Sequence, residues 1–240
     1  MRHVVVSTAI AALLAAAPFS RAGAQGAPAL SPASPTGSAD DRALLQAAVA
    51  HRALGSDSAA AVIYFFSDYA CPDCARFVTE RLDSLLTAVV RPGRARIIHA
   101  SFLIPRLLRG WQGASAAFCI AAITDASTFD EASRRIFAEQ AQWATARDAA
   151  PTLRAIARDV GADPARYDDC IARDLMAPLI LSDVRAGFAA RLTGTPTLVV
   201  LSARALTDRT RDPFEGAIAL SGSAPMRQIL DAVEKVAKAK

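Results

Sequence analysis

The chain has 240 residues, 52% of them hydrophobic, with 27 basic and 23 acidic side chains and a formal net charge of +4. Two of the basic residues, Arg2 and Arg21, lie in a segment that we expect to be removed, which leaves 25 basic residues and a net charge of +2. This near balance does not predict a nucleic-acid partner.

The first 24 residues have the pattern of a signal peptide. A short basic start at Arg2 and His3 precedes an apolar run over residues 4–17, which is too short to span a membrane. Residues 22–24 (AGA) form an A-x-A cleavage site, so the mature chain is expected to begin at Gln25. We therefore expect an exported protein, periplasmic or secreted, in which disulfides persist.

Residues 25–39 are rich in Pro, Ser, Gly and Ala and carry no charge, which predicts a flexible linker. An N-terminal helix is expected over residues 40–58, starting at Asp40 or Asp41 as the cap and ending near Leu54. A compact domain should begin at residue 59 or 60.

The most informative motif is Cys71-Pro72-Asp73-Cys74, which follows an apolar strand over residues 60–66 and begins a helix over residues 72–90. Pro72 suits the first helical position, where no backbone N–H is needed. Because a helix N-terminus favours the thiolate, the pKa of Cys71 should be lowered. Cys71 is therefore the predicted attacking sulfur and Cys74 the resolving one.

The remaining elements complete an α/β pattern. A strand over residues 95–102 follows the helix and should be parallel to the first strand. A helical region over residues 107–192 comes next, with a predicted capping box at Thr128 and Glu131. Strands at 197–201 and 215–220 and a helix over 224–238 finish the chain. The order is βαβ, a helical insertion, then ββα.

This order, with C-x-x-C at the first strand–helix junction, resembles the thioredoxin fold, and the long insertion resembles its DsbA-like branch. Residues 66–74 (FSDYACPDC) are similar to the F-S-D-Y-x-C-P-x-C stretch of that branch. Residues 194–197 (GTPT) resemble the segment that holds the family's cis-proline. The resemblance assigns residues 59–106 and 193–240 to a thioredoxin-like domain and residues 107–192 to an inserted helical domain.

The resemblance implies a protein thiol–disulfide oxidoreductase that needs no cofactor beyond its Cys71–Cys74 disulfide. Thr195 and Pro196 would dock an extended substrate peptide beside Cys71. Cysteine-containing exported proteins would be the substrates, and a membrane protein would reset the pair. The direction of electron flow stays open among oxidase, reductase and isomerase. The expected active-site support residues are Pro72, Asp73, Thr195 and Pro196.

Three positions bear on the strength of this centre as an oxidant. Asp73 replaces the histidine of the strongly oxidising members, and its carboxylate would repel a nearby thiolate. Phe65 stands where related proteins often have a buried acid, six residues before the nucleophile. Asp68 is then a candidate proton relay to Cys74, although a strand-end cap is an equally plain interpretation.

Cys119 and Cys170 both lie in the predicted helical insertion. Some DsbA-like proteins have a second disulfide at similar positions, so the resemblance favours a structural disulfide here. Two buried thiols acting as small apolar residues remain an alternative. A shuttle that passes electrons to the active pair is another.

Other functional classes are less compatible with the sequence. A four-cysteine zinc site is disfavoured because Cys119 and Cys170 are 51 residues apart and do not form a close pair, so we expect no metal. A Cys–His hydrolase lacks a suitably placed histidine, since His99 lies inside a strand. A non-catalytic chaperone or binding module on the same fold is the main alternative. We expect a monomer.

Overall fold

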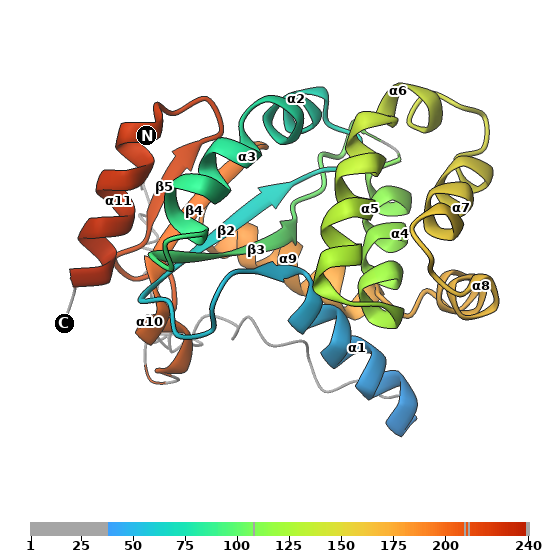
Figure 1. The fold of residues 1–240 in the computed structure, drawn as a ribbon, viewed down its shortest axis with the longest axis horizontal. Coiled ribbons are helices and arrows are strands. Elements are labelled where there is room, and N and C mark those ends of the chain that lie inside the picture. Colours follow the sequence, from blue (N-terminus) through green and yellow to red (C-terminus); the bar gives the residue numbers. More distant parts are fainter. Residues whose placement is uncertain (1–37, 108, 209, 211, 239–240) are drawn as a thin grey trace, which may run out of the picture.

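The computed structural model describes residues 38–107, 109–208, 210 and 212–238, so the predicted signal peptide and most of the predicted linker lie outside the described residues. Its centre is a five-stranded sheet in the order β1-β3-β2-β4-β5 (Figure 1). β2 and β3 are parallel, as predicted, and the other neighbouring pairs are antiparallel. The strands are β1 (Ala53–Leu54), β2 (Ala61–Ser67), β3 (Ala95–Ser101), β4 (Thr197–Ser202) and β5 (Ile218–Ser221).

The central strand β2 is buried on both faces, which explains its unbroken apolar sequence. Ile63 and Phe65 belong to a large core on one face, whereas Tyr64 and Phe66 belong to a smaller core on the other. The C-terminal helix α11 (Met226–Lys238) packs on β4 and β2, and α9 (Ala177–Ala189) packs on β3. This rigid sheet fixes the end of β2, where the cysteine motif begins.

The N-terminal helix differs from the prediction. α1 spans Ala39–His51, and Ser38 caps it by accepting from the Asp41 backbone while Asp41 accepts from the Ser38 backbone, both at 3.1 Å. The cap is thus Ser38, because a serine three residues before an acid can form this reciprocal capping box. The helix also ends before Leu54, which pairs in β1 with Ile97 of β3.

The predicted single helix over residues 72–90 is three consecutive segments. α2 spans Pro72–Glu80, α3 spans Leu82–Leu85, and a π-helical segment covers Leu86–Val90. The break falls at Arg81, whose φ of −127° is outside the helical range. Arg81 donates to the backbone carbonyls of Gly222 and Ala224, which ties the end of α2 to the turn after β5.

The insertion between β3 and β4 is helical, as predicted. α5 begins earlier than expected, because Asp125 caps it by accepting from the Thr128 backbone at 2.8 Å. Asp163 caps α8, and Pro164 occupies its first position. The inserted helices are α4 (Gly110–Ile123), α5 (Ala126–Ala138), α6 (Gln140–Trp143), α7 (Ala150–Asp159), α8 (Pro164–Ala172) and α9.

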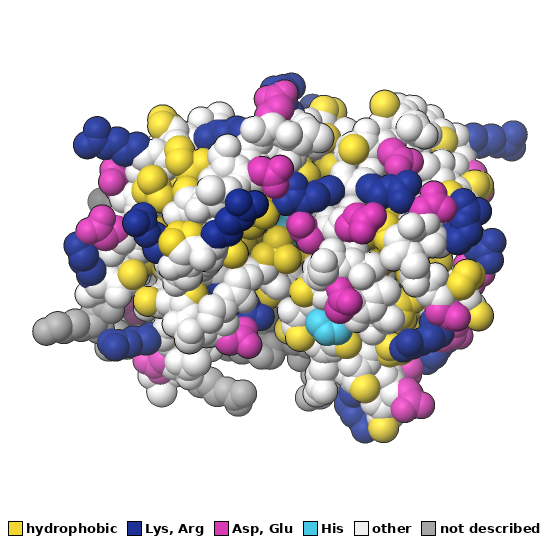
Figure 2. Space-filling view, viewed as in Figure 1, with side chains coloured by type: hydrophobic (Ala, Val, Ile, Leu, Met, Phe, Trp, Pro, Cys, Tyr) yellow, Lys and Arg dark blue, Asp and Glu magenta, His cyan; other side chains and the backbone are white. Residues whose placement is uncertain are grey.

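The last part of the chain also shifts slightly from expectation. A short helix, α10 (Ala203–Thr207), follows β4, and β5 begins at Ile218 rather than Glu215. On the face seen in Figure 2, basic and acidic side chains are interspersed. Side chains of opposite sign form ion pairs elsewhere in the described chain, such as Arg134 with Asp83. Within the described residues, no helix is both long and apolar enough to cross a bilayer.

Candidate active site

Cys71 and Cys74 lie where the central strand β2 gives way to α2. Cys71 is the N-cap of α2, and its carbonyl accepts from the Cys74 and Ala75 backbones, both at 3.1 Å. Its backbone N–H donates to the Asp68 carbonyl at 2.9 Å. Cys71 is 7% exposed and Cys74 is fully buried, and both are thiols in this structure. One sulfur therefore faces the surface while the other lies behind it.

The two thiols have opposite electrostatic environments. The Cys74 thiol, the Thr195 hydroxyl and the backbone N–H groups of Cys74 and Asp73 stabilise the Cys71 thiolate and lower the pKa of Cys71 to about 5, against the opposing effect of burial. Burial raises the pKa of Cys74 well above its ordinary value, and the Cys71 thiolate adds to that rise. At neutral pH Cys71 is therefore a thiolate, and Cys74 is a protonated thiol.

The Thr195–Pro196 segment lies against this pair. The peptide bond between Thr195 and Pro196 is cis. The Cys71 thiol donates to the Thr195 backbone carbonyl at 3.7 Å. Within the part of the chain that the structure describes, the buried Thr195 hydroxyl has no hydrogen-bond partner, so it is available to the Cys71 thiolate. The Gly222 backbone donates to the Pro196 carbonyl at 2.9 Å, and a Cβ at Gly222 would collide with the Pro196 ring. A glycine is thus needed for the β5 turn to approach the proline.

A surface groove of about 670 Å³ runs beside this segment. Its walls come from α2, from the loop over residues 191–197 and from β5 with its following turn. Charged side chains of both signs line it, including Arg76, Glu80 and Arg191. The groove offers the backbone of the cis-proline loop to an extended peptide, so a bound chain would pass close to Cys71.

Asp68 is a buried carboxylate at the end of β2. It accepts from the Ala70 backbone at 2.8 Å and from the Ile104 backbone at 2.7 Å. Burial raises the pKa of Asp68 to about 6, and the nearby Cys71 thiolate contributes to the rise. The carboxylate lies against the first turn of α4, where a Cβ at Gly110 would collide with it. Asp68 is both a strand-end cap and a titratable group whose charge interacts with the Cys71 thiolate.

Gln140 of the insertion also holds the cysteine loop, and sequence reasoning missed it. Its side-chain amide donates to the Tyr69 carbonyl at 2.7 Å and to the Cys71 carbonyl at 3.0 Å. The Tyr69 hydroxyl pairs with Ser133 at 2.9 Å, and its ring stacks on Phe137 at 4.4 Å between centroids. Because these partners are about 70 residues apart in sequence, no local signal could have identified them.

The remaining expected support residues have clear places. Pro72 is the first residue of α2, as its fixed φ suits. Asp73 is exposed and forms an ion pair with Arg76 at 3.1 Å, so an adjacent cation partly offsets its charge. Phe65 is fully buried and stacks on Phe77 at 4.9 Å between centroids.

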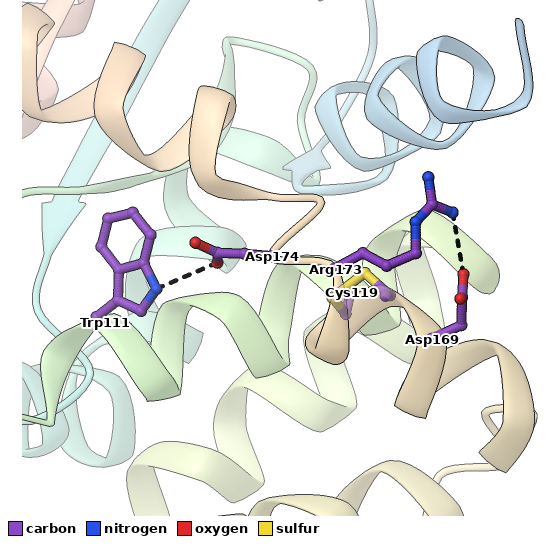
Figure 3. The surroundings of a disulfide bond; sticks show 6 residues. Trp111, Cys119, Asp169, Arg173 and Asp174 are labelled. Carbon is purple, nitrogen blue, oxygen red and sulfur yellow. Dashed lines mark hydrogen bonds and ion pairs between the residues drawn. A yellow bond between two sulfur atoms is a disulfide. The ribbon is translucent and has the colours of Figure 1, made fainter. Parts of the chain in front are cut away.

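The other two cysteines are bonded to each other. The Cys119–Cys170 disulfide joins α4 to α8 with a Cα–Cα distance of 5.9 Å, and both residues are buried (Figure 3). These sulfurs are therefore unable to complete a metal site with Cys71 and Cys74. Over the described residues, no group of three or more His, Cys, Asp or Glu side chains is placed to bind a metal ion.

Comparison with known proteins agrees with this geometry. A family model described as thioredoxin matches residues 47–219, which is well over half of the chain. The chain belongs to the thioredoxin family. No curated protein matches the sequence of this thioredoxin-family chain.

Several solved structures share the arrangement of this thioredoxin-family chain. BdbD from Bacillus subtilis, in its oxidised form, has a TM-score of 0.64 at 17% identity, over 78% of this chain and 93% of BdbD. Wolbachia pipientis α-DsbA1 has a TM-score of 0.61 at 15% identity, over 78% and 90%. Chlamydia trachomatis DsbA has a TM-score of 0.59 at 18% identity, over 77% and 90%. These similarities confirm a thioredoxin fold with a helical insertion.

Proposed function

We propose that this protein is an exported thiol–disulfide oxidoreductase that oxidises cysteine pairs in other exported proteins. The observation that carries this proposal is the stabilised thiolate of Cys71, held between the Cys74 thiol and Thr195, a residue that lines the groove. Stabilising the thiolate stabilises the reduced enzyme, which makes its disulfide a better oxidant. The ion pair of Asp73 with Arg76 weakens the repulsion that the sequence alone suggested.

The reaction would proceed by two exchanges. In the first, a substrate thiolate attacks Cys71 of the oxidised pair, the Cys71–Cys74 bond breaks, and Cys74 leaves with both electrons of that bond. In the second, another substrate thiolate attacks the substrate sulfur of the mixed disulfide. Cys71 then leaves as a thiolate, and its low pKa makes it a good leaving group. The substrate is oxidised to a disulfide, and the enzyme is left with two thiols.

Cys74 needs a proton when it leaves, because burial disfavours its thiolate. We assign that proton to Asp68, whose pKa of about 6 allows it to exchange protons near neutral pH. In the reverse reaction, the ionised Asp68 would take the proton from Cys74. The raised pKa of Asp68, its charge interaction with Cys71 and the approach of its backbone to the Cys74 sulfur support a relay in addition to a capping role.

Substrate docking and re-oxidation complete the proposal. An extended substrate segment would lie in the groove along Thr195 and Pro196, with its cysteine at Cys71. The groove has charges of both signs, which suits varied unfolded chains rather than one sequence. A membrane protein of the exporting compartment would return the reduced pair to its disulfide.

The decisive experiment is the reduction potential of the Cys71–Cys74 pair, measured by equilibration with glutathione. We expect a value above the glutaredoxin range of about −230 to −200 mV. A value near the thioredoxin value of about −270 mV would overturn the oxidising direction.

Two variants test whether the thiol chemistry is the function. Cys74→Ser should accumulate a mixed disulfide when its Cys71 thiolate attacks a disulfide of a substrate protein and one substrate sulfur leaves as a thiolate, because no resolving thiol is present to break the new bond. Cys71→Ser should form no such adduct and should not oxidise the substrate. If Cys71→Ser still supported the biological task, the protein would instead be a binding or chaperone module.

A further inference from the structure

The turn that follows β5 is bonded directly to the cis-proline segment. The Gly222 backbone N–H donates to the Pro196 carbonyl at 2.9 Å, and a side chain at Gly222 would collide with the proline ring. The residue before it, Ser221, pairs with Thr197 in the ladder between β4 and β5. The position of this turn therefore helps to fix where Pro196 lies, and with it the preceding residue, Thr195.

The turn is itself held by the side chain of Arg81. One nitrogen of the guanidinium group donates to the Gly222 carbonyl, and another donates to the Ala224 carbonyl. Within the part of the chain that the structure describes, no other group donates to either carbonyl. A planar guanidinium can bond two acceptors at once, and its charge strengthens both bonds. Arg81 is therefore the internal anchor of the turn.

The anchor lies on the same helix as the two active-site cysteines. Cys71 is the N-cap of α2 and Arg81 is its C-cap. The Arg81 guanidinium carbon lies 5.8 Å from the centre of the Phe77 ring, one turn earlier on the helix. Phe77 is buried and stacks on Phe65 of β2. One end of α2 thus carries the reactive sulfur, while its other end holds the turn that supports the cis-proline segment.

We propose that Arg81 is a positioning residue that keeps the cis-proline segment against Cys71. The link runs from the Arg81 guanidinium to the Gly222 carbonyl, and then from the Gly222 N–H to the Pro196 carbonyl. It ends at Thr195, whose carbonyl is 3.7 Å from the Cys71 sulfur. The effect of Arg81 on the Cys71 thiolate requires no substrate, whereas its effect on substrate docking rests on the proposed function.

Alkylation of the reduced protein by iodoacetamide across a range of pH tests the effect on the thiolate. Arg81→Met removes both donors and keeps an unbranched side chain beside Phe77. The alkylation midpoint should rise by at least about 0.5 pH unit, or about threefold in the ionisation equilibrium, because Thr195 would stabilise the Cys71 thiolate less well. Arg227→Met is the matched control. It removes an arginine that is 92% exposed at the start of α11, and it should leave the midpoint unchanged.

Gly222→Ala tests the same link from its other end and decides the question if Arg81→Met does not fold. The added methyl group should push the turn away from Pro196 and raise the midpoint in the same direction. Thr195→Val shows whether the link acts through the threonine hydroxyl. In that background neither Arg81→Met nor Gly222→Ala should raise the midpoint further. An unchanged midpoint in the folded single variants, or a rise that persisted undiminished with Thr195→Val, would overturn the proposal.

Substrate docking is tested by single-turnover oxidation of two dithiols by the pre-oxidised protein. One is a short unfolded peptide with two cysteines, and the other is dithiothreitol, which has no backbone to pair with the cis-proline segment. Arg81→Met should lower the ratio of the peptide rate constant to the dithiothreitol rate constant at least about threefold. An unchanged ratio would overturn the docking role. If the native protein oxidised neither dithiol, the proposed function would fail, and the alkylation midpoints would still decide the role of Arg81.

Discussion

The side-chain amide of Gln140 donates to the carbonyl oxygen of Cys71 at 3.0 Å. It also donates to the Tyr69 carbonyl, so one residue of the insertion binds two acceptors of the loop that carries Cys71. The helical insertion is therefore part of the redox centre's framework, and the geometry of the thiolate depends on both halves of the fold.

Gln140→Met should perturb the centre while keeping a similar side-chain volume. The Tyr69 carbonyl would lose the Gln140 donor, and the Cys71 carbonyl would keep only the Cys74 and Ala75 backbones as donors. This should cost about 1–3 kcal/mol of the free energy of unfolding, measured by urea denaturation. The looser loop should also raise the pKa of Cys71, seen as a higher midpoint in the pH dependence of alkylation. Gln142→Met, at an exposed position of the same helix, should change neither quantity. A loss of stability with an unaltered pKa would show that Gln140 has no role in positioning Cys71.

Alkylation of the reduced protein by iodoacetamide should report the low pKa of Cys71. Because only the thiolate reacts, the rate should rise as pH increases through about 5 and then level off. An ordinary cysteine would instead show a midpoint near about 8.5. Cys74→Ala should move the midpoint upward, because it removes the Cys74 thiol, whose hydrogen bond is the largest stabilising influence on the Cys71 thiolate. A midpoint above about 7 in the unmodified protein would contradict this electrostatic account.

Asp68→Asn should slow the resolution of a mixed disulfide between Cys71 and glutathione. In this step Cys74 must lose its proton, and Asp68 accepts it once ionised, so the rate should increase as pH rises through about 6. General bases accelerate reactions by about 10²–10⁴-fold. We therefore expect Asp68→Asn to resolve the adduct at least about tenfold more slowly than the native protein, and its rate should lack the increase around that pH. Asp73→Asn, which alters an exposed carboxylate, is the control. If the two variants resolved the adduct equally fast, the relay would be excluded.

Replacing both Cys119 and Cys170 by Ala should lower the free energy of unfolding by about 4 kcal/mol. The chain-entropy model gives this value for a loop of about 50 residues. The disulfide lies outside the redox groove, so the reduction potential of the Cys71–Cys74 pair should be unchanged once the variant is folded. A potential shifted by more than about 30 mV, roughly tenfold in equilibrium constant, would show that the two pairs are coupled.

His99→Met should stabilise the protein, and more so in acid. Neither ring nitrogen of His99 has a hydrogen-bond partner among the described residues, and the ring packs against Phe65 and Phe129. Burial lowers the pKa of His99 to about 3, so between about pH 6.5 and 3 the unfolded chain binds a proton that the folded chain does not. The native protein therefore loses stability as pH falls through this window, and the variant lacks that loss.

Urea denaturation at pH 7 and at about pH 4.5, which lies inside that window, measures the effect. The advantage of His99→Met over the native protein should be larger at the lower pH. Ile97→Met changes a buried, non-titrating position of the same strand. Its difference from the native protein in the free energy of unfolding should be the same at both pH values. An advantage that shrank on acidification would mean that His99 is protonated in the folded state.

The motif around Cys71 and the order of the elements were enough to predict the fold. Turns, helix starts and buried strands depend on residues that are neighbours in the sequence. The helix limits were less predictable. Ser38 rather than Asp40 caps α1, and the break at Arg81 depends on carbonyls 141 and 143 residues away. The sequence did not predict the role of Gln140 for the same reason, because its two acceptors are distant in sequence.

The two edges of the sheet differ in how they are covered. β1 covers the outer edge of β3, although its two residues, Ala53 and Leu54, precede the point where the apolar pattern suggested that the domain begins. At the opposite edge, β5 pairs only with β4 among the described strands. Open strand edges are templates for intermolecular pairing. A chain truncated at residue 59 would keep the redox motif but expose a second such template, and so could polymerise in both directions.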